Sequence, residues 1–167
     1  IDLLVEMTAE YCIAQVDAGA QALQLFDSWV SALDADQFGR WVTRPTSDIV
    51  SRIRKVYPDI PIIGFPKGAG INYLSYVDQT GITAAGMDSS LPVDWAAENL
   101  QTRLPVQGNL DPFCLLAGGQ ALDDAIDRIL QNLSGGPFVF NLGHGINKDT
   151  PIAHVEQAIA RVRGFKP

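Results

Sequence analysis

The residue best suited to chemistry in this sequence is His144, which stands between two glycines in the run Asn141-Leu142-Gly143-His144-Gly145-Ile146. An imidazole gains and loses a proton near neutral pH, so histidine serves in acid–base catalysis and in carboxylate binding. Glycines on both sides let a ligand approach the backbone closely. Two interpretations remain open at this point: His144 acts in a site, or it only hydrogen-bonds within its loop.

Polar residues follow each of five short apolar segments that we predict to be strands, at about residues 22–26, 61–65, 82–87, 105–108 and from Phe138 onward. Helical patterns separate these segments, which predicts a parallel sheet with right-handed crossovers. Ligands bind at the carboxyl edge of such sheets. The polar residues at the five predicted strand ends are Asp27-Ser28, Lys67, Asp88, Asn109 to Asp111, and His144.

The helices that must support these strands follow from apolar spacing. The first is expected to run to about Val16 and to pack Leu4, Met7, Tyr11 and Ala14 on the sheet. Residues 30–42 lack a clear period and are expected to form a long loop with a helical turn, before a helix capped by Thr46, Ser47 or Asp48. The strongest pattern is Leu122, Ile126, Ile129, Leu130 and Leu133; the closing helix follows Thr150-Pro151, with Ile152, Val155, Ile159 and Val162 inward and His154 on the surface.

Composition excludes several classes of protein. The chain has 167 residues, a net charge of −7 and a pI near 4.6, which indicates one globular domain and argues against nucleic acid or an anionic membrane as a partner. No apolar run is long enough to span a bilayer. Cys12 and Cys114 have no paired spacing, so we expect reduced thiols of a cytosolic protein. The sequence begins at Ile1 inside a helical pattern, as a segment of a longer protein would.

Two α/β architectures fit five strands. An open doubly wound sheet for a dinucleotide would carry GxGxxG after a strand, and the sequence has no such motif. A (β/α)8 barrel has eight strands in about 250 residues. We therefore expect residues 1–167 to be the C-terminal portion of a single barrel domain, comprising about the last five β/α units, although periodicity alone does not decide between the two.

Several motifs also resemble those of one family. Gln24-Leu25-Phe26-Asp27-Ser28, Gly64-Phe65-Pro66-Lys67-Gly68, Gly86-Met87-Asp88, the run from Pro105 to Pro112 and the run from Asn141 to Ile146 are similar to the C-terminal half of uroporphyrinogen decarboxylases. The resemblance keeps its register over nearly the whole chain. The Gln107 to Pro112 run and the His144 run, one strand apart, are its most specific parts.

The resemblance implies a (β/α)8 barrel, usually a cytoplasmic homodimer, that converts uroporphyrinogen to coproporphyrinogen by stepwise loss of acetate carboxyl groups, without a metal or organic cofactor. Ser28 matches the family's serine beside the substrate, Phe26 the aromatic residue two positions earlier, and His144 the histidine near the substrate's side chains. The family's substrate-binding arginines, central aspartate and active-site tyrosine belong to the other half, so the isolated chain is expected to be inactive. Trp29 departs from the small or histidine-type residue expected after the serine.

Two alternatives remain. A corrinoid or thiol methyltransferase of the same barrel superfamily would bind zinc through a histidine and cysteines, and only Cys114 lies near a predicted strand end. A non-catalytic module could instead bind an anion at the loop of Lys67 and its neighbouring glycines.

Overall fold

The computed structural model describes residues 1–166, which form two compact units, residues 1–85 and the residues from Gly86 onward. The strands belong to a parallel sheet whose order follows the chain, β1-β2-β3-β4-β5. In a doubly wound sheet, the strand order reverses at a switch point. A strand order that follows the chain is instead that of successive units of a (β/α)8 barrel. The expected α/β fold of about five barrel units is confirmed. The two units are described separately below.

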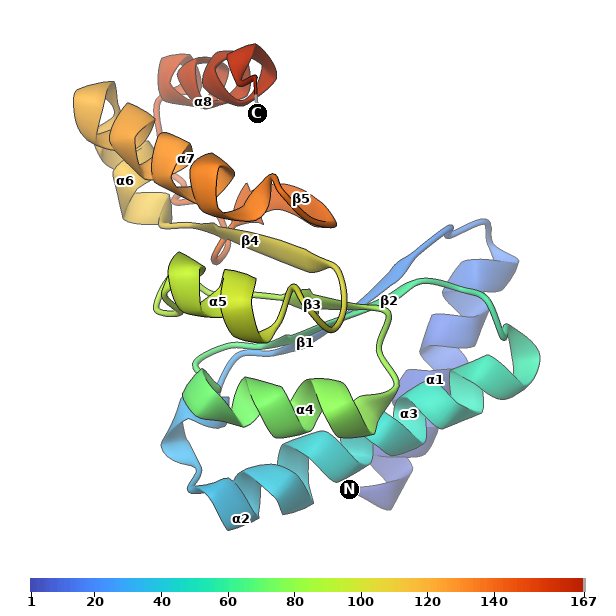
Figure 1. Ribbon diagram of the computed structural model, residues 1–167. Helices are drawn as coiled ribbons and strands as arrows, with labels where there is room; N and C mark the ends of the chain where they lie inside the picture. Colours follow the sequence, from blue (N-terminus) through green and yellow to red (C-terminus); the bar gives the residue numbers. More distant parts are fainter. Residues whose placement is uncertain (167) are drawn as a thin grey trace. The chain divides into compact units, whose positions relative to one another are not determined.

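In the first unit, helices cover parallel strands, of which β1 pairs with β2 and β2 pairs with β3 (Figure 1). Leu23 pairs with Ile62 at the start of β1 and β2, and Gly64 pairs with Ala85 across β2 and β3. The elements are α1 (Asp2–Asp17), β1 (Leu23–Asp27), η1 (Val30–Ala32), α2 (Ala35–Phe38), η2 (Gly39–Thr43), α3 (Arg44–Val56), β2 (Ile62–Pro66), η3 (Gly70–Asn72), α4 (Tyr73–Thr80) and β3 (Ala84–Gly86).

The core of this unit forms where α3 and α4 meet β2. Ile53 and Ile62 are fully buried, and the ring of Tyr76 lies edge-on to that of Phe38 with centroids 6.2 Å apart. Burial is the main reason that the pKa of Tyr76 rises to about 12. The second strand is buried along almost its whole length, as its apolar sequence predicts.

Two predictions for this unit are wrong. α1 packs against α3 through Val5, Ala9 and Cys12, while Leu4 and Tyr11 are more than half exposed. The helix is apolar around most of its circumference, so spacing alone does not identify the buried face. Residues 35–56 are continuously helical, through the π-helical segment η2, instead of forming a loop followed by a cap at Thr46.

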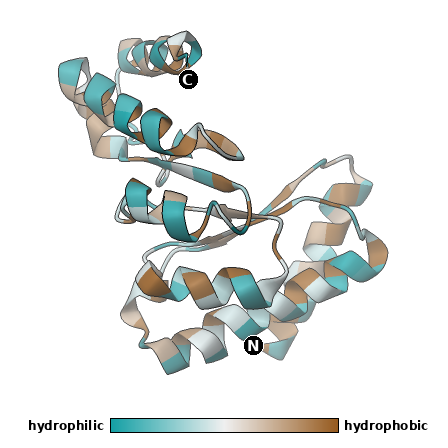
Figure 2. Ribbon diagram, in the orientation of Figure 1, coloured by the Kyte–Doolittle hydropathy of each residue, from teal (hydrophilic) through white to brown (hydrophobic). Residues whose placement is uncertain are grey.

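The second unit pairs β4 with β5 in parallel, and Val106 lies opposite Phe138. Its helices are centred on α7, which packs against α5, α6 and α8. Figure 2 shows hydrophilic and hydrophobic residues along α7, as expected for a helix with one buried face. The elements are α5 (Val93–Asn99), β4 (Val106–Leu110), α6 (Pro112–Ala117), α7 (Gly119–Leu133), β5 (Phe138–Leu142) and α8 (Ile152–Gly164).

The predicted face of α7 is confirmed, because all five of its predicted residues are buried. The predictions for the end of the chain are partly wrong. β5 alternates between half-buried and exposed residues, with Val139 53% exposed, although its sequence suggested a buried strand. In α8, Ala158 is buried while Ile152 and Ile159 are exposed. The helix begins at Ile152 after Pro151, and no side chain accepts a capping hydrogen bond there, so Thr150 does not cap the helix.

His154 is not the surface residue that its position off the apolar stripe indicated. It is half-buried, and its Nδ1 lies 3.1 Å from the carbonyl oxygen of Leu116 and 3.2 Å from that of Leu115, at the end of α6. Gly118 follows with φ +68°, and a Cβ there would lie 2.4 Å from the His154 ring. His154 therefore supplies a polar contact for carbonyls that a helix end leaves unpaired.

Gly64 tests the packing of α4 on β2. A Cβ at this position would lie 2.6 Å from the hydroxyl oxygen of Tyr76, so Gly64→Ala should lower the free energy of unfolding by about 1–3 kcal/mol in urea titrations. Gly39 is the matched control, since it is helical and a Cβ there meets nothing within 4 Å. Gly39→Ala should raise the free energy of unfolding by about 0.4–1 kcal/mol. Equal changes for the two variants would contradict this packing.

Cys12 tests the buried face of α1. Burial raises the pKa of its thiol, and the thiolate is the form that reacts with alkylating reagents. In the folded chain, iodoacetamide should therefore modify the half-buried Cys114 before Cys12, as followed by peptide mass mapping. In urea the two thiols should react alike. Preferential modification of Cys12 in the folded chain would mean that α1 does not bury this face.

Candidate functional site at the strand ends

The carboxyl end of β1 carries Phe26 and Ser28, two of the predicted site residues. Phe26 is 69% exposed and its ring lies edge-on to Phe65, with centroids 5.7 Å apart. Ser28 follows the last strand residue and is half-buried. The neighbouring Trp29 is 85% exposed and does not cover the core. The end of β1 thus presents an aromatic face and a hydroxyl group.

The loop after β2 brings Lys67 beside this strand end. The Lys67 backbone N–H donates to the Asp27 carbonyl oxygen at 2.9 Å, which continues the pairing of β1 and β2 by one residue. The next residue, Gly68, has φ +80°, and a Cβ there would lie 2.7 Å from Cβ of Ser31. Packing against η1 therefore accounts for this glycine, so the Lys-Gly sequence carries no separate indication of an anion site.

His144 lies in the second unit, directly after the carboxyl end of β5. It is exposed, and so are Gly145 and Ile146 after it. The start of the loop is bonded to β4, because Gly143 donates its backbone N–H to the Leu110 carbonyl oxygen at 2.8 Å. Near its end, Thr150 donates its own to the carbonyl oxygen of Asn147 at 3.0 Å, which forms a turn within the loop. An accessible imidazole on this loop can donate to or accept from a bound molecule.

A buried polar network underlies this loop, at the ends of β3 and β4. Asn109 and Asp88 are 5% and 3% exposed. The Asn109 amide donates to the carbonyl oxygens of Asp88 and Leu91 at 2.9 and 2.8 Å. The Asp88 carboxylate accepts from the backbone N–H and the hydroxyl of Ser90. Both residues are predicted polar strand ends without an assigned role; the signal that could have identified Asn109 is an amide near the carboxyl end of a predicted buried strand.

Two cavities lie beside these strand ends. One, of about 370 Å³, is lined by Ser90 after β3, Asn109 of β4, Asp111 after β4 and Arg128 of α7, among others. The other, of about 390 Å³, is lined mostly by apolar residues of β5, α8 and the loop between them, including Phe140, Leu142 and Ile146. The Asp111 carboxylate accepts from the Phe113 N–H at 2.9 Å and caps α6, so its place is explained by helix capping.

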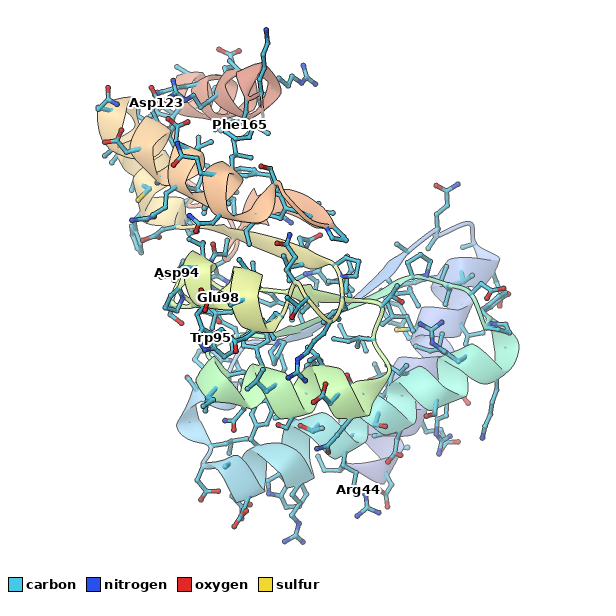
Figure 3. All side chains as sticks on the ribbon, viewed as in Figure 1. Arg44, Asp94, Trp95, Glu98, Asp123 and Phe165 are labelled. Carbon is cyan, nitrogen blue, oxygen red and sulfur yellow. The ribbon has the colours of Figure 1, made fainter. Side chains whose placement is uncertain are left out.

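A larger cavity, of about 550 Å³, is built only from α7, α8 and the two residues after α8. Asp123 and Phe165 line it and are marked in Figure 3. Asp127 and Arg161, which form an ion pair, also line it. Arg161 holds the pKa of the Asp127 carboxyl below its usual value. No strand end contributes to this cavity, and an exposed ion pair explains its charged residues.

Within residues 1–166, no three His, Cys, Asp or Glu side chains lie close enough to hold a metal ion together. Among the helices described above, none combines the length and the hydrophobicity that crossing a bilayer requires.

Solved structures with a similar fold include a methyltransferase from Methanosarcina mazei, with a TM-score of 0.80 and 23% identity over 98% of this chain and 48% of that one. A B12-independent methionine synthase from Shewanella sp. W3-18-1 has a TM-score of 0.68 and 12% identity, over 96% of this chain and 53% of that one. At these identities the two structures support the fold alone.

Curated relatives with higher sequence identity indicate the family. The chain is 51% identical to a uroporphyrinogen decarboxylase from Sphingopyxis alaskensis and 52% identical to one from Rhizorhabdus wittichii, in each case over 98% of this chain and 48% of the relative. It thus spans about half the length of the curated relatives it matches, corresponding to their C-terminal half. The family model for uroporphyrinogen decarboxylase (URO-D) matches residues 1–165. The chain therefore belongs to the uroporphyrinogen decarboxylase family.

Proposed function

We propose that this chain is the C-terminal part of a uroporphyrinogen decarboxylase, which converts uroporphyrinogen to coproporphyrinogen by stepwise removal of its acetate carboxyl groups. The observation that carries the proposal is the match of the family model to residues 1–165, which include every strand end described above. Because the chain spans about half the length of its relatives, we assign the activity to the complete barrel and expect these 167 residues to be inactive alone.

The same reasoning applies to the domain: residues 1–167 are the C-terminal portion of a single barrel domain. Exposed apolar side chains support this assignment. Leu4, Met7 and Tyr11 of α1 are 56–67% exposed in the first unit, and Val139 of β5 is 53% exposed in the second. Several large apolar side chains exposed on one face of a helix are typical of a surface that packs against further protein. The remaining β/α units of the barrel are the partner that the family supplies.

The reaction determines what the site must provide. Loss of CO2 from an acetate on a pyrrole leaves an electron pair that needs an acceptor, and protonation of a ring carbon creates one. The C–C bond to the carboxylate then breaks, CO2 leaves, and the bonding electrons neutralise the protonated ring. A proton adds to the side-chain carbon, and the first proton leaves the ring carbon, which restores the pyrrole. The protein must therefore supply a proton donor, hydrogen bonds to carboxylates and a negative charge near the cationic ring.

We assign roles in this reaction to three residues of this chain. His144 binds a substrate carboxylate or transfers the proton, which its exposed position on a glycine-flanked loop supports. Ser28 donates a hydrogen bond to a carboxylate. Phe26 offers its exposed ring to the apolar edge of the substrate. The negative charge and the arginines that bind the remaining carboxylates belong to the other half of the barrel.

The family resemblance also supports a cytoplasmic homodimer that uses neither metal nor organic cofactor. The methyltransferase alternative is not favoured, because the family match and the relatives at 51–52% identity are decarboxylases, while the methyltransferase structure shares the fold at 23% identity. The anion-binding alternative loses its basis at Gly68, which packing explains.

Activity should appear when this chain is co-expressed with the N-terminal half of the Sphingopyxis alaskensis relative, and in neither half alone. The measurement is conversion of uroporphyrinogen to coproporphyrinogen by the purified complex.

Replacing His144 by asparagine should lower kcat by about 10²-fold or more, because a positioned acid–base group contributes that much. Ser28→Ala should raise KM by about tenfold, the value of one hydrogen bond to a charged group.

The control is Lys148→Ala in the same loop, whose side chain is 91% exposed and which should leave kcat unchanged. A stable complex of the two wild-type halves that produces no coproporphyrinogen would reject the proposed function. Stoichiometric zinc in that complex would then favour the methyltransferase alternative. Full activity of His144→Asn would reject the role of the histidine while leaving the function in place.

A further inference from the structure

The position of His144 depends on a backbone contact made by the preceding residue. A Cβ on Gly143 would lie 2.4 Å from the backbone nitrogen of Ser89 and 3.0 Å from the carbonyl oxygen of Asn109. Gly143 therefore rests directly on the backbone of two other strand ends, with no side chain between them. Any shift of Ser89 or Asn109 is transmitted to Gly143, and His144 is the next residue.

Asn109 holds the surface on which Gly143 rests. Its amide donates to the carbonyl oxygens of Asp88 and Leu91, which flank Ser89 in the chain. The Asp88 carboxylate accepts two further hydrogen bonds from Ser90. The four-residue turn from Asp88 to Leu91 is thus bonded at its first and last residues to one buried side chain from β4. Hydrogen bonds in such a buried network restrain geometry more strongly than the same bonds exposed to water.

We infer that Asn109 is a positioning residue: its two hydrogen bonds hold the turn at Asp88–Leu91 against Gly143 and thereby place His144 for its step. The expected effect on catalysis rests on the proposed function, whereas the expected effect on the position of the His144 loop does not. Small displacements of a reacting group lower the rate without a matching change in substrate binding. Asn109 should therefore affect kcat, through His144, more than it affects KM.

The chain offers a matched control in Gln101. Its side-chain amide also donates to two backbone carbonyl oxygens, those of Leu133 at 2.7 Å and Pro137 at 3.3 Å. These carbonyls precede β5, whereas Gly143 follows it. Asn109→Ala thus removes side-chain hydrogen bonds to backbone carbonyls beneath the residue that follows β5, whereas Gln101→Ala removes such bonds from residues that precede β5. If Asn109 only stabilised the fold, its removal would loosen both ends of β5 alike.

The first readout is amide hydrogen exchange in the 167-residue chain. Gly143 N–H bonds to Leu110 at the carboxyl end of the β4–β5 pair, and Val106 N–H bonds to Pro137 at the amino end. In Asn109→Ala, the rate of exchange should rise about tenfold more at the Gly143 amide than at the Val106 amide. In Gln101→Ala, it should rise about tenfold more at the Val106 amide than at the Gly143 amide. An identical pattern in the two variants would overturn the inference, and this readout needs no activity.

The second readout is decarboxylation by the complex with the N-terminal half. Asn109→Ala should lower kcat by about tenfold and leave KM within about twofold, while Gln101→Ala should leave both within about twofold. In a His144→Asn background, Asn109→Ala should have no further effect on kcat, because the two residues act in one step. Fully additive effects would overturn the inference. A wild-type complex without activity would reject the proposed function instead, and the exchange pattern separates the two failures.

A second pair of variants applies if Asn109→Ala does not fold. Gly143→Ala forces its new methyl group against Ser89, whereas a Cβ on Gly145 meets nothing within 4 Å. Gly143→Ala should speed exchange of the Leu91 N–H, which bonds to the Asp88 carbonyl oxygen, by about tenfold, and Gly145→Ala should leave it unchanged. Equal exchange in the two variants would show that the contact does not couple the turn to the loop, and would overturn the inference.

Discussion

Direct contact between backbones at the strand ends is the constraint on which the second unit depends. Gly108 has φ +140°, and a Cβ there would lie 2.6 Å from the Met87 carbonyl oxygen. Gly143 makes an equally close approach to Ser89. Side chains at these two positions would push the segments apart, because real Cβ atoms do not approach so closely. The absence of a side chain therefore allows three strand ends to meet.

This contact explains how an exposed histidine can have a defined place. Loops carry most functional residues, but a loop without support would leave its side chains mobile. Here the residue before His144 rests on backbone that is itself held by buried hydrogen bonds of Asn109 and Asp88. His144 stays accessible while the residues beneath its loop are buried. The proposed function needs this combination, since a proton-transfer group must meet the substrate at a set distance.

The sequence predicted best where one pattern had one physical explanation. α7 has a single apolar face, and its predicted residues are buried. β2 is apolar and short, and it is buried as expected. Prediction failed where two faces were equally apolar, as in α1, and where a tertiary partner changed the role of a residue. His154 lies off the apolar stripe of α8, yet it meets the carbonyls at the end of α6, which no local pattern encodes.

The sequence by itself determined the alternation of strands and helices, the polar residues at the strand ends and the family to which they belong, because these depend on residue types and local spacing. Only the tertiary structure decided which face of α1 is buried, that β5 is half exposed, and that Asn109 lies beneath the loop of His144. Burial and hydrogen bonding join residues far apart in sequence. Asn109 and Leu91 illustrate this, since the bond between them spans 18 positions, a distance at which periodicity carries no information.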